Sequence, residues 1–217
     1  MGQSKQFLPL LGKPAIVYTL QAFEQAKSVD EIILVCRDED KEQLNTCVHM
    51  AGITKPVIFT LGGTSRQQSV FSGVRACASQ TEYIIIHDGA RPLITWDLIE
   101  KVTADAFTYG AAALGVPVKD TIKVTNAQGF ATATPDRSTL WAVQTPQVFE
   151  KTSYLSAVKQ AIQQEADYTD DCQLMEQLGN QVHLCMGSYV NIKLTTKEDL
   201  IVAQAILNQR NTERSNS

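Results

Sequence analysis

Short apolar runs alternate with amphipathic stretches along most of the chain. The run over 31–36 (EIILVC) is rich in β-branched residues, which is typical of a strand buried on both faces of a sheet. Before it, apolar residues over 16–23 recur at helical spacing behind Pro14, and proline favours the first turn of a helix. These two patterns predict a helix followed by a buried strand.

The same alternation continues towards the middle of the chain. It predicts a helix to about residue 50, a strand over 56–60, a helix from residue 65, a strand to residue 87, a helix over 95–107 and a strand over 110–118. Ser65 with Gln68 fits a capping box, which marks the start of the third of these helices. This order predicts an α/β fold with a mostly parallel sheet and helices on both faces. Such sheets bind ligands at the carboxyl ends of their strands.

The alternation is interrupted over 118–142. Two β-rich runs flank a turn sequence at 126–129 (NAQG), which predicts a hairpin that projects from the domain as a β-arm. An exposed two-stranded hairpin is only marginally stable by itself. We therefore expect this arm to pack on a partner subunit.

The last part of the chain returns to the earlier pattern. It predicts a helix over 153–164, another from residue 169, a strand over 181–186, and a final helix for which Thr195 and Glu198 form a capping box. The segment 208–217 (NQRNTERSNS) is polar and is expected to be frayed. The chain thus reads as one domain over 1–217, with 118–142 as the arm and 208–217 as a polar tail.

Composition narrows the function. The chain has 217 residues, of which 44% are hydrophobic and 19% charged, which is enough for a packed core. Its net charge of −4 argues against bulk nucleic-acid binding, so an anionic ligand must be held by a few placed cations. No apolar run reaches membrane-spanning length and the N-terminus does not resemble a signal peptide, so we expect a soluble cytoplasmic protein with no membrane partner. The five cysteines form no C-x-x-C pair, and buried reduced thiols are preferred over zinc ligands or disulfides.

The sequence HDGARP follows directly after a predicted buried strand, where an α/β ligand site belongs. Asp88 could bind Mg²⁺ or a sugar hydroxyl, and Arg91 could bind a phosphate through two hydrogen bonds. The alternative is a structural ion pair that closes the loop. In GGTSRQQS, Gly62 and Gly63 precede a helix N-terminus, which favours an anion or a polar base edge. Ser69 is either a base contact or an ordinary residue of the first helical turn.

Three cations stand among apolar or turn residues: Lys5, Arg137 and Lys193. Each alone could be an ordinary solvated surface group. His87 neighbours Asp88, but no serine or cysteine nucleophile is paired with it and the histidines have no metal-ligand spacing, so a structural role is preferred. Isolated cations with one carboxylate and no evident base are typical of phosphoryl or nucleotidyl transfer, in which the protein contributes positioning and charge.

Seven blocks in order resemble one family. They are SKQFLPLLGKP, GGTSRQQSV, HDGARP, PVKDTIK, DRSTLWAVQTPQVF, YTDD and NIKLTTKEDL. Together they are similar to the 2-C-methyl-D-erythritol 4-phosphate cytidylyltransferases of the non-mevalonate isoprenoid pathway, from residue 2 to about residue 207. The resemblance implies a nucleotide-binding fold of the Rossmann-like, glycosyltransferase-A-like kind. It also implies a homodimer joined through the arm, and a nucleotidyltransferase that uses CTP and Mg²⁺ and releases pyrophosphate.

The resemblance also implies roles for residues. Lys5 would stabilise the α-phosphate in the transition state, while Arg137 and Lys193 would hold the sugar phosphate for in-line attack. Asp88 would lie near the ribose and the metal. The remaining implied contacts are Arg91, Thr121 and Thr145 with the sugar phosphate, and Gly62, Gly63 and Ser69 with the cytosine. Thr121 and Arg137 would come from the partner's arm.

The chain departs from the family at its beginning. The family starts with a strand and a glycine-rich loop that supplies another arginine, whereas this chain starts at the equivalent of the end of that loop. Either the start was assigned late, at an internal methionine, or the chain is this short and impaired as an enzyme. We favour the late start, because losing a central strand exposes apolar surface and unpaired backbone. A ribitol-5-phosphate cytidylyltransferase and a catalytically silent subunit remain the alternatives.

Overall fold

The structure, a computed structural model, describes residues 5–215. The helices are α1 (Ala15–Gln25), α2 (Lys41–Ala51), α3 (Arg66–Ala76), α4 (Trp96–Tyr109), α5 (Lys151–Gln163), α6 (Asp171–Gln177) and α7 (Lys197–Ser215), with 3₁₀ turns η1 (Lys5–Phe7), η2 (Asp38–Asp40) and η3 (Arg137–Thr139). The strands are β1 (Pro9–Leu10), β2 (Lys13–Pro14), β3 (Ile32–Cys36), β4 (Val57–Leu61), β5 (Tyr83–Ile86), β6 (Ala111–Pro117), β7 (Val124–Thr125), β8 (Ala131–Ala133), β9 (Trp141–Glu150) and β10 (His183–Met186). The predicted helices and strands of the first half are therefore present, with ends shifted by a few residues.

The described strands form four sheets: β1 pairs with β2, β7 pairs with β8, and the remaining strands form the two sheets of the core. One has the order β10-β6-β9-β5, and the other pairs β3 with β4. β10 is parallel to β6 and β3 is parallel to β4, whereas β9 is antiparallel to both of its neighbours. The prediction of a mostly parallel sheet was therefore wrong for the β10-β6-β9-β5 sheet, which is mixed.

β9 is the longest strand that sequence reasoning missed, together with the two-residue strands β1 and β2. Its centre is buried on both faces, yet Gln144, Thr145 and Gln147 occupy buried positions there, so it shows neither an apolar run nor an apolar–polar alternation. Pro146 also argues against a central strand, because proline cannot donate to the ladder. Only the pairing with β5 and β6 identifies β9 as a central strand.

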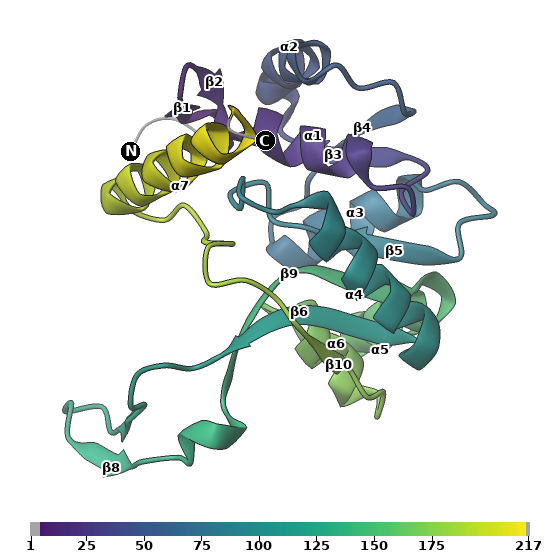
Figure 1. Cartoon of the computed structure of the whole chain (residues 1–217). Coiled ribbons are helices and arrows are strands. Elements are labelled where there is room, and N and C mark those ends of the chain that lie inside the picture. Colours follow the sequence, from purple (N-terminus) through teal and green to yellow (C-terminus); the bar gives the residue numbers. More distant parts are fainter. Residues whose placement is uncertain (1–4, 216–217) are drawn as a thin grey trace.

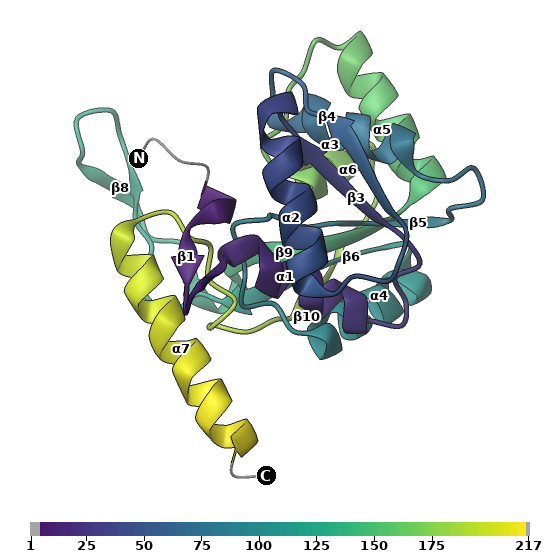
Figure 2. The same cartoon turned by 90° about the horizontal axis from the view of Figure 1, so that it is seen from above.

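Helices cover both faces of the sheets, as predicted (Figure 2). On one face α1, α2 and α4 pack into one apolar cluster with β3 and β6, around Leu20, Leu44 and Ile99. On the other, α5 and α6 pack with α3 and β5 around Phe149 and Tyr154. These two apolar layers enclose the sheets, and a third buried cluster that includes Leu10, Leu93 and Leu207 packs α7 against β1.

The helix caps show how accurately short sequence motifs predict where helices begin. The hydroxyl of Ser65 accepts from the backbone N–H of Gln68 at 3.2 Å, so the capping box before α3 is confirmed. The box before α7 was placed one residue too early, because Thr196 and Asp199 form it: Asp199 accepts from the Thr196 N–H at 2.7 Å and donates its own N–H to the Thr196 hydroxyl.

The expected fraying from residue 208 was wrong as far as Ser215, where α7 ends. Arg210 on this helix donates two hydrogen bonds to the carbonyl of Leu93, each at 3.1 Å. This contact ties the last part of α7 to the body, which a polar sequence pattern does not reveal.

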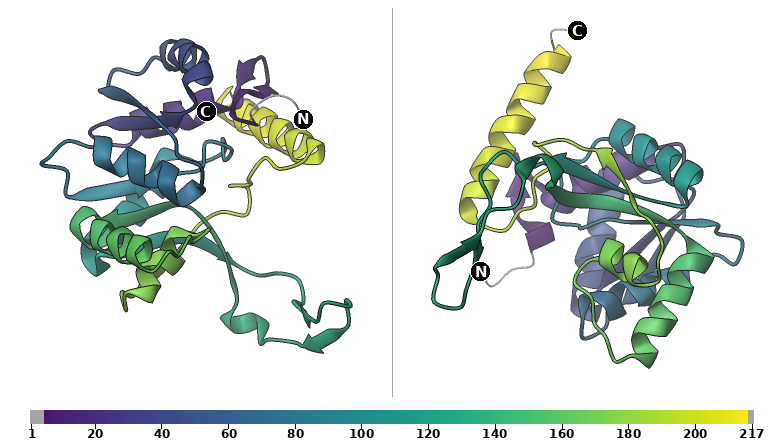
Figure 3. Two further views of the ribbon diagram at one scale, coloured as in Figure 1. Left: turned by 180° about the vertical axis from the view of Figure 1, so that it is seen from behind. Right: turned by 90° about the horizontal axis from the view of Figure 1, so that it is seen from below.

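Residues 118–140, which join β6 to β9, extend away from the body (Figures 1 and 3). β7 and β8 pair there in an antiparallel hairpin whose turn is closed by hydrogen bonds between Asn126, Gly129 and Phe130. Gly129 has a φ of 85°, a conformation that favours glycine. We call residues 118–140 the projecting segment.

Two further findings concern the whole of the described chain. Its five cysteines are free and four of them are buried, in agreement with the preferred interpretation as reduced thiols. Within residues 5–215, no helix combines the length and the apolar character needed to cross a membrane.

Candidate functional site

The loop that follows β5 carries the central residues of the site. Arg91 donates its backbone N–H to the carbonyl of Asp88 at 2.9 Å, which closes the loop into a turn. Gly89 lets the turn lie against α1, because a Cβ there would stand 3.2 Å from Ile16 Cδ1. The backbone N–H of Leu194 donates to the Ala90 carbonyl at 2.7 Å and so brings the segment before α7 beside this loop.

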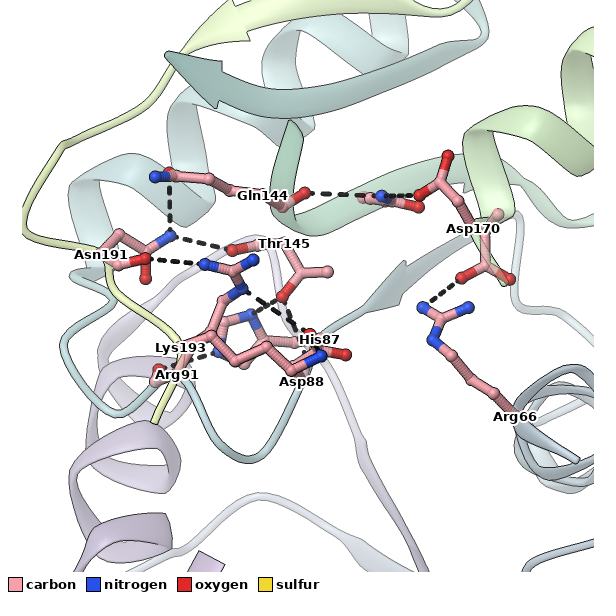
Figure 4. Close-up of polar contacts among 11 residues, drawn as sticks. Arg66, His87, Asp88, Arg91, Gln144, Thr145, Asp170, Asn191 and Lys193 are labelled. Carbon is pink, nitrogen blue, oxygen red and sulfur yellow. Dashed lines mark hydrogen bonds and ion pairs between the residues drawn. The ribbon is translucent and has the colours of Figure 1, made fainter. Parts of the chain in front are cut away.

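That contact places two cations around one carboxylate (Figure 4). Lys193 Nζ lies 2.8 Å from Asp88 Oδ2, and Arg91 Nε lies 3.7 Å from the same oxygen. Burial alone would raise the pKa of Asp88, but the hydrogen bond and charge of Lys193, with the charges of Arg66 and Arg91, outweigh it and lower the pKa. Asp88 is therefore a carboxylate at neutral pH.

A buried hydrogen-bond network holds Asp88 and Arg91 in position. Thr145 Oγ1 on β9 accepts the backbone N–H of Asp88 at 3.0 Å, and Arg91 Nη1 donates to the Asn191 carbonyl at 2.9 Å. The Asn191 side chain, which is fully buried, donates to the Thr145 carbonyl at 3.0 Å and to Gln144 Oε1 at 3.2 Å. Asn191 was missed by sequence reasoning, although it stands two residues before Lys193 in the NIK block.

His87 has a positioning role in this network. Its Nε2 donates to the Arg91 carbonyl at 3.2 Å, which leaves Nδ1 to accept from the Thr145 hydroxyl at 3.1 Å. Burial lowers the pKa of His87 to about 4, so the ring is neutral, as this bonding pattern requires. Its ring centroid also lies 5.3 Å from that of Phe23. These contacts agree with the structural role preferred from the sequence.

The glycine-rich loop after β4 folds tightly onto the first turn of α3. Ser69 Oγ accepts from the Gly63 N–H at 3.1 Å and donates to the Ser65 carbonyl at 2.9 Å. A Cβ on Gly63 would lie only 2.3 Å from Gln68 Cβ, so this close approach requires glycine. Ser69 thus shapes the loop, and the exposed backbone of Gly62 and Gly63 faces the same cavity as Asp88.

Asp170 and Asp171 of the YTDD block bind polar side chains of α3, α5 and β9 beside the site. Arg66 Nη2 at the start of α3 lies 2.6 Å from Asp171 Oδ2, and the Tyr154 hydroxyl donates to Asp171 Oδ1 at 2.7 Å. Asp170 caps α6 and accepts from Gln147 Nε2 at 2.7 Å. Arg66 was not among the candidates from the sequence, yet it lines the same cavity as Asp88.

The structure brings some of the predicted residues together and separates others. Asp88, Arg91, Thr145 and Lys193 form one cluster. Lys5 is exposed at the start of η1, and Gln6, the next residue of this turn, lines the same cavity as Asp88. Thr121 and Arg137 lie in the projecting segment, where Arg137 Nη1 donates to the Lys119 carbonyl at 2.7 Å. Within one chain this segment leads away from the cluster (Figure 1).

A metal site made of protein ligands alone is not present among the described residues, because no group of three or more His, Cys, Asp or Glu side chains there could hold an ion. A magnesium ion that binds substrate phosphates needs only one or two carboxylates. Asp88 fits that requirement, since its carboxylate is ionised and lines the cavity.

Comparison with known proteins identifies the family. The sequence model described as "IspD: 2-C-methyl-D-erythritol 4-phosphate cytidylyltransferase" matches residues 1–209. The chain belongs to this family. A relative from Desulforamulus reducens named 2-C-methyl-D-erythritol 4-phosphate cytidylyltransferase is 43% identical over 208 residues, covering 95% of this chain and 89% of the relative. A chloroplastic relative of the same name from Oryza sativa is 39% identical over 212 residues, covering 97% and 71%.

Solved structures of the family share the fold. 4-Diphosphocytidyl-2C-methyl-D-erythritol synthase from Anaerococcus prevotii superposes with a TM-score of 0.87 at 31% identity, covering 94% of this chain and 93% of that one. 2-C-methyl-D-erythritol 4-phosphate cytidylyltransferase from Thermus thermophilus superposes with a TM-score of 0.77 at 28% identity, covering 94% of both chains. The resemblance inferred from the seven sequence blocks is therefore confirmed.

Proposed function

We propose that the Asp88 cluster is where this chain joins CTP and 2-C-methyl-D-erythritol 4-phosphate to give 4-diphosphocytidyl-2-C-methyl-D-erythritol and pyrophosphate. The chain is a cytidylyltransferase of the non-mevalonate pathway by its family. The observation that supports the site is Lys193 and Arg91 converging on one carboxylate at the carboxyl end of β5. Ligands of open α/β sheets bind at this end of the strands.

The charges of the cluster suit the reaction. A phosphate oxygen of the sugar attacks the α-phosphorus of CTP, and the bond to pyrophosphate breaks. The attacking oxygen is already ionised, so the protein needs no general base and instead has to hold two anions together. Two cations and one carboxylate leave the cluster with a charge of +1. The Lys193 side chain is 44% exposed, so its ammonium can reach a bound phosphate.

The division of roles follows from what surrounds each group. Lys193 and Arg91 hold the sugar phosphate, and Lys5 stabilises charge on the α-phosphate from η1. The backbone of Gly62 and Gly63 receives the cytosine, in a loop shaped by Ser69. Thr145 contributes through Asp88, because its hydroxyl already bonds the Asp88 N–H and His87. A direct contact between Thr145 and the sugar phosphate would have to compete with those bonds.

A divalent cation, Mg²⁺ in the first instance, would be held by Asp88 together with substrate phosphates. When bound, it would neutralise part of the triphosphate charge. Asp88 keeps its own position by the Thr145 hydroxyl and the two neighbouring cations.

A homodimer completes the proposed site. The projecting segment exposes Ile122, Val124 and Phe130, of which Phe130 is 72% exposed. Apolar side chains gathered on an exposed hairpin mark an interaction surface, and a two-stranded hairpin is marginal alone. We assign the partner's copy of this segment to the site, where Thr121 and Arg137 reach the sugar phosphate.

The test is pyrophosphate release from CTP, methylerythritol phosphate and Mg²⁺. It is run on this chain and on a version extended upstream in its reading frame, with ribitol 5-phosphate as the competing acceptor. Release that depends on CTP and favours methylerythritol phosphate supports the proposal. Preference for ribitol 5-phosphate as the acceptor would instead indicate a ribitol-5-phosphate cytidylyltransferase. Folded, dimeric protein that releases no pyrophosphate in either version would favour a silent subunit.

A further inference from the structure

Residues 187–194, between β10 and α7, contact both regions that carry candidate cations. Near α7 they belong to the Asp88 cluster, where Lys193 Nζ lies 2.8 Å from Asp88 Oδ2. Near β10 they lie along β6, because the Gly187 N–H donates to the Gly115 carbonyl at 2.8 Å. We call residues 187–194 the connecting loop. It joins the Asp88 cluster to the end of β6, where the projecting segment begins.

Gln144 on β9 holds the connecting loop in a fixed position. Its side chain is buried, donates to the Ser188 carbonyl at 2.9 Å and accepts from Asn191 Nδ2 at 3.2 Å. A Cβ on Gly187 would lie 2.7 Å from Gln144 Oε1, so this approach requires glycine. The loop therefore cannot slide along β6 and β9 without breaking buried hydrogen bonds, which are costly to leave unmade.

Tyr189 of the connecting loop grips the chain at the point where it leaves the body. Its hydroxyl donates to the carbonyl of Pro117, the last residue of β6, at 2.8 Å. Lys119 Nζ lies 3.6 Å from the centroid of the Tyr189 ring, close enough for a cation–π interaction. These two contacts fix the first residues of the projecting segment against the connecting loop.

Lys119 also holds Arg137, one of the candidate cations. Its carbonyl accepts from Arg137 Nη1 at 2.7 Å. Beside it, the Val118 N–H donates to the Leu140 carbonyl at 3.0 Å, so the two ends of the projecting segment are paired where they meet the body. The contacts thus run from the Tyr189 ring through Lys119 to the Arg137 guanidinium.

The remainder of the projecting segment is held by contacts within itself. The hydrogen bonds that the structure describes over 120–135 join residues of this hairpin to one another, such as Lys123 Nζ to Thr134 Oγ1 at 2.7 Å. The hairpin leads away from the body (Figure 1). Its direction within one chain is therefore set by the contacts around Pro117 and Lys119.

We propose that Tyr189 is a positioning residue that aims Arg137 at the site of the partner subunit. This inference rests on the proposed function, in which the projecting segment supplies Arg137 to the partner's site. An arginine that holds a phosphate through paired N–H groups needs a defined orientation. Tyr189 does not touch the substrate and acts through Lys119.

Replacing Tyr189 tests the two contacts separately. Tyr189→Leu removes both of them, whereas Tyr189→Phe keeps the ring for Lys119 and removes only the hydrogen bond to Pro117. In Tyr189→Leu the KM for methylerythritol phosphate should rise about 10-fold, because Arg137 is misplaced. The KM for CTP should stay the same, since Arg137 serves the sugar phosphate. Tyr189→Phe should fall between Tyr189→Leu and the wild type.

Two further changes separate positioning from general damage. Lys119→Gln should raise the KM for methylerythritol phosphate as Tyr189→Leu does, and Lys119→Arg should restore it, because arginine also places a cation over the ring. Tyr109→Leu is the matched control: Tyr109 is an exposed tyrosine that stacks on His183, and its loss should leave both KM values unchanged. Thermal unfolding checks that each variant is folded.

Mixed dimers decide on which site Tyr189 acts. Lys193→Ala and Arg137→Ala chains are refolded together, so the only complete site combines Lys193 of the second chain with Arg137 of the first. Tyr189→Leu added to the first chain, which supplies Arg137, should raise the KM for methylerythritol phosphate. The same change added to the second chain, which supplies Lys193, should not.

Amide hydrogen exchange gives a readout that needs no catalysis. The Val118 amide should exchange about tenfold faster in Tyr189→Leu than in the wild type or in Tyr109→Leu, because the start of the projecting segment opens more often. This measurement separates the inference from the proposed function. A chain that releases no pyrophosphate would contradict the function, while exchange at Val118 would still show whether Tyr189 holds the projecting segment.

The opposite results would overturn the inference. A rise in KM that follows the chain supplying Lys193, or that is equal in the two placements, would mean that Tyr189 acts on its own site and not through Arg137. Unchanged exchange at Val118 in Tyr189→Leu would mean that Tyr189 does not hold the projecting segment. Failure of Lys119→Arg to restore the KM would remove the cation–π contact from the argument.

Discussion

The Asp88 cluster and the projecting segment both carry candidate cations, but they are held in opposite ways. Lys193, Arg91 and Thr145 are positioned by contacts between residues far apart in sequence, from β5, β9 and the segment before α7. Arg137 is positioned mainly by nearby chain, through the Lys119 carbonyl and the short turn η3. The Asp88 cluster is thus preorganised by the packed helices and sheets of the same chain. The projecting segment can become part of a site only by packing against another surface.

Removing a cation from the cluster gives the largest expected effect. Lys193→Ala should lower kcat/KM by about 10²–10³-fold, because the phosphate loses a preorganised charge. Steady-state pyrophosphate release measures it. Lys197→Ala, an exposed lysine at the start of α7, is the matched control and should retain activity. Near-normal turnover of Lys193→Ala would remove Lys193 from the site.

Mixing variants tests whether the two regions meet across subunits. Arg137→Ala and Lys193→Ala should each be strongly impaired as separate preparations. After unfolding and refolding together, mixed dimers contain one site with an intact Lys193 and an intact partner Arg137, so part of the activity returns. Co-refolding two batches of Arg137→Ala is the control. If no mixture recovers activity, each site is built from one chain.

A pH series probes the support of the cluster through His87. Its pKa is lowered to about 4 in the folded protein from 6.5, so the unfolded chain binds the additional proton between those values. The free energy of unfolding should therefore fall as the pH drops from 6.5 to 4, by about 1–3 kcal/mol from this residue. Urea unfolding of the wild type and His87→Gln measures the difference, and equal slopes in the two proteins would contradict it.

The smallest expected effect comes from the hydroxyl behind Asp88. Thr145→Val leaves the Asp88 N–H and His87 Nδ1 without this partner, and should cost about 1–2 kcal/mol of stability with a lower kcat. Thr145→Ser restores the hydroxyl and should recover both. A valine variant with unchanged kcat would show that the position of Asp88 does not depend on Thr145.

Several elements were predictable because their signals are local. The β-branched run of β3, the capping box before α3 and the helical spacing in α1 each depend on neighbours within a few residues. The candidate residues Asp88, Arg91 and Lys193 were proposed from their sequence blocks, and the structure places them side by side. The capping box before α7 was misplaced by one residue, since Thr195 and Thr196 offer the same local signal.

Other parts had no local signal. The buried amides and proline of β9 hide a central strand, which only its pairing with β5 and β6 identifies. Asn191 and Arg66 are unremarkable in the sequence. They become part of the site because Asn191 meets Thr145 and Arg66 meets Asp171 from distant segments. Sequence pattern cannot foresee such contacts, because they depend on which elements pack side by side.

By itself, the sequence determined the periodicity of most helices and strands, the family, and the residue types that are candidates for holding anions, because these are properties of short stretches of chain. Only the tertiary structure decided that one carboxylate lies between Lys193 and Arg91, that β9 is antiparallel in the middle of a mixed sheet, and that residues of β3 and β5 line one cavity. The physical reason is that backbone pairing and burial join residues tens to a hundred positions apart, and their energies belong to the packed assembly of elements rather than to any one of them.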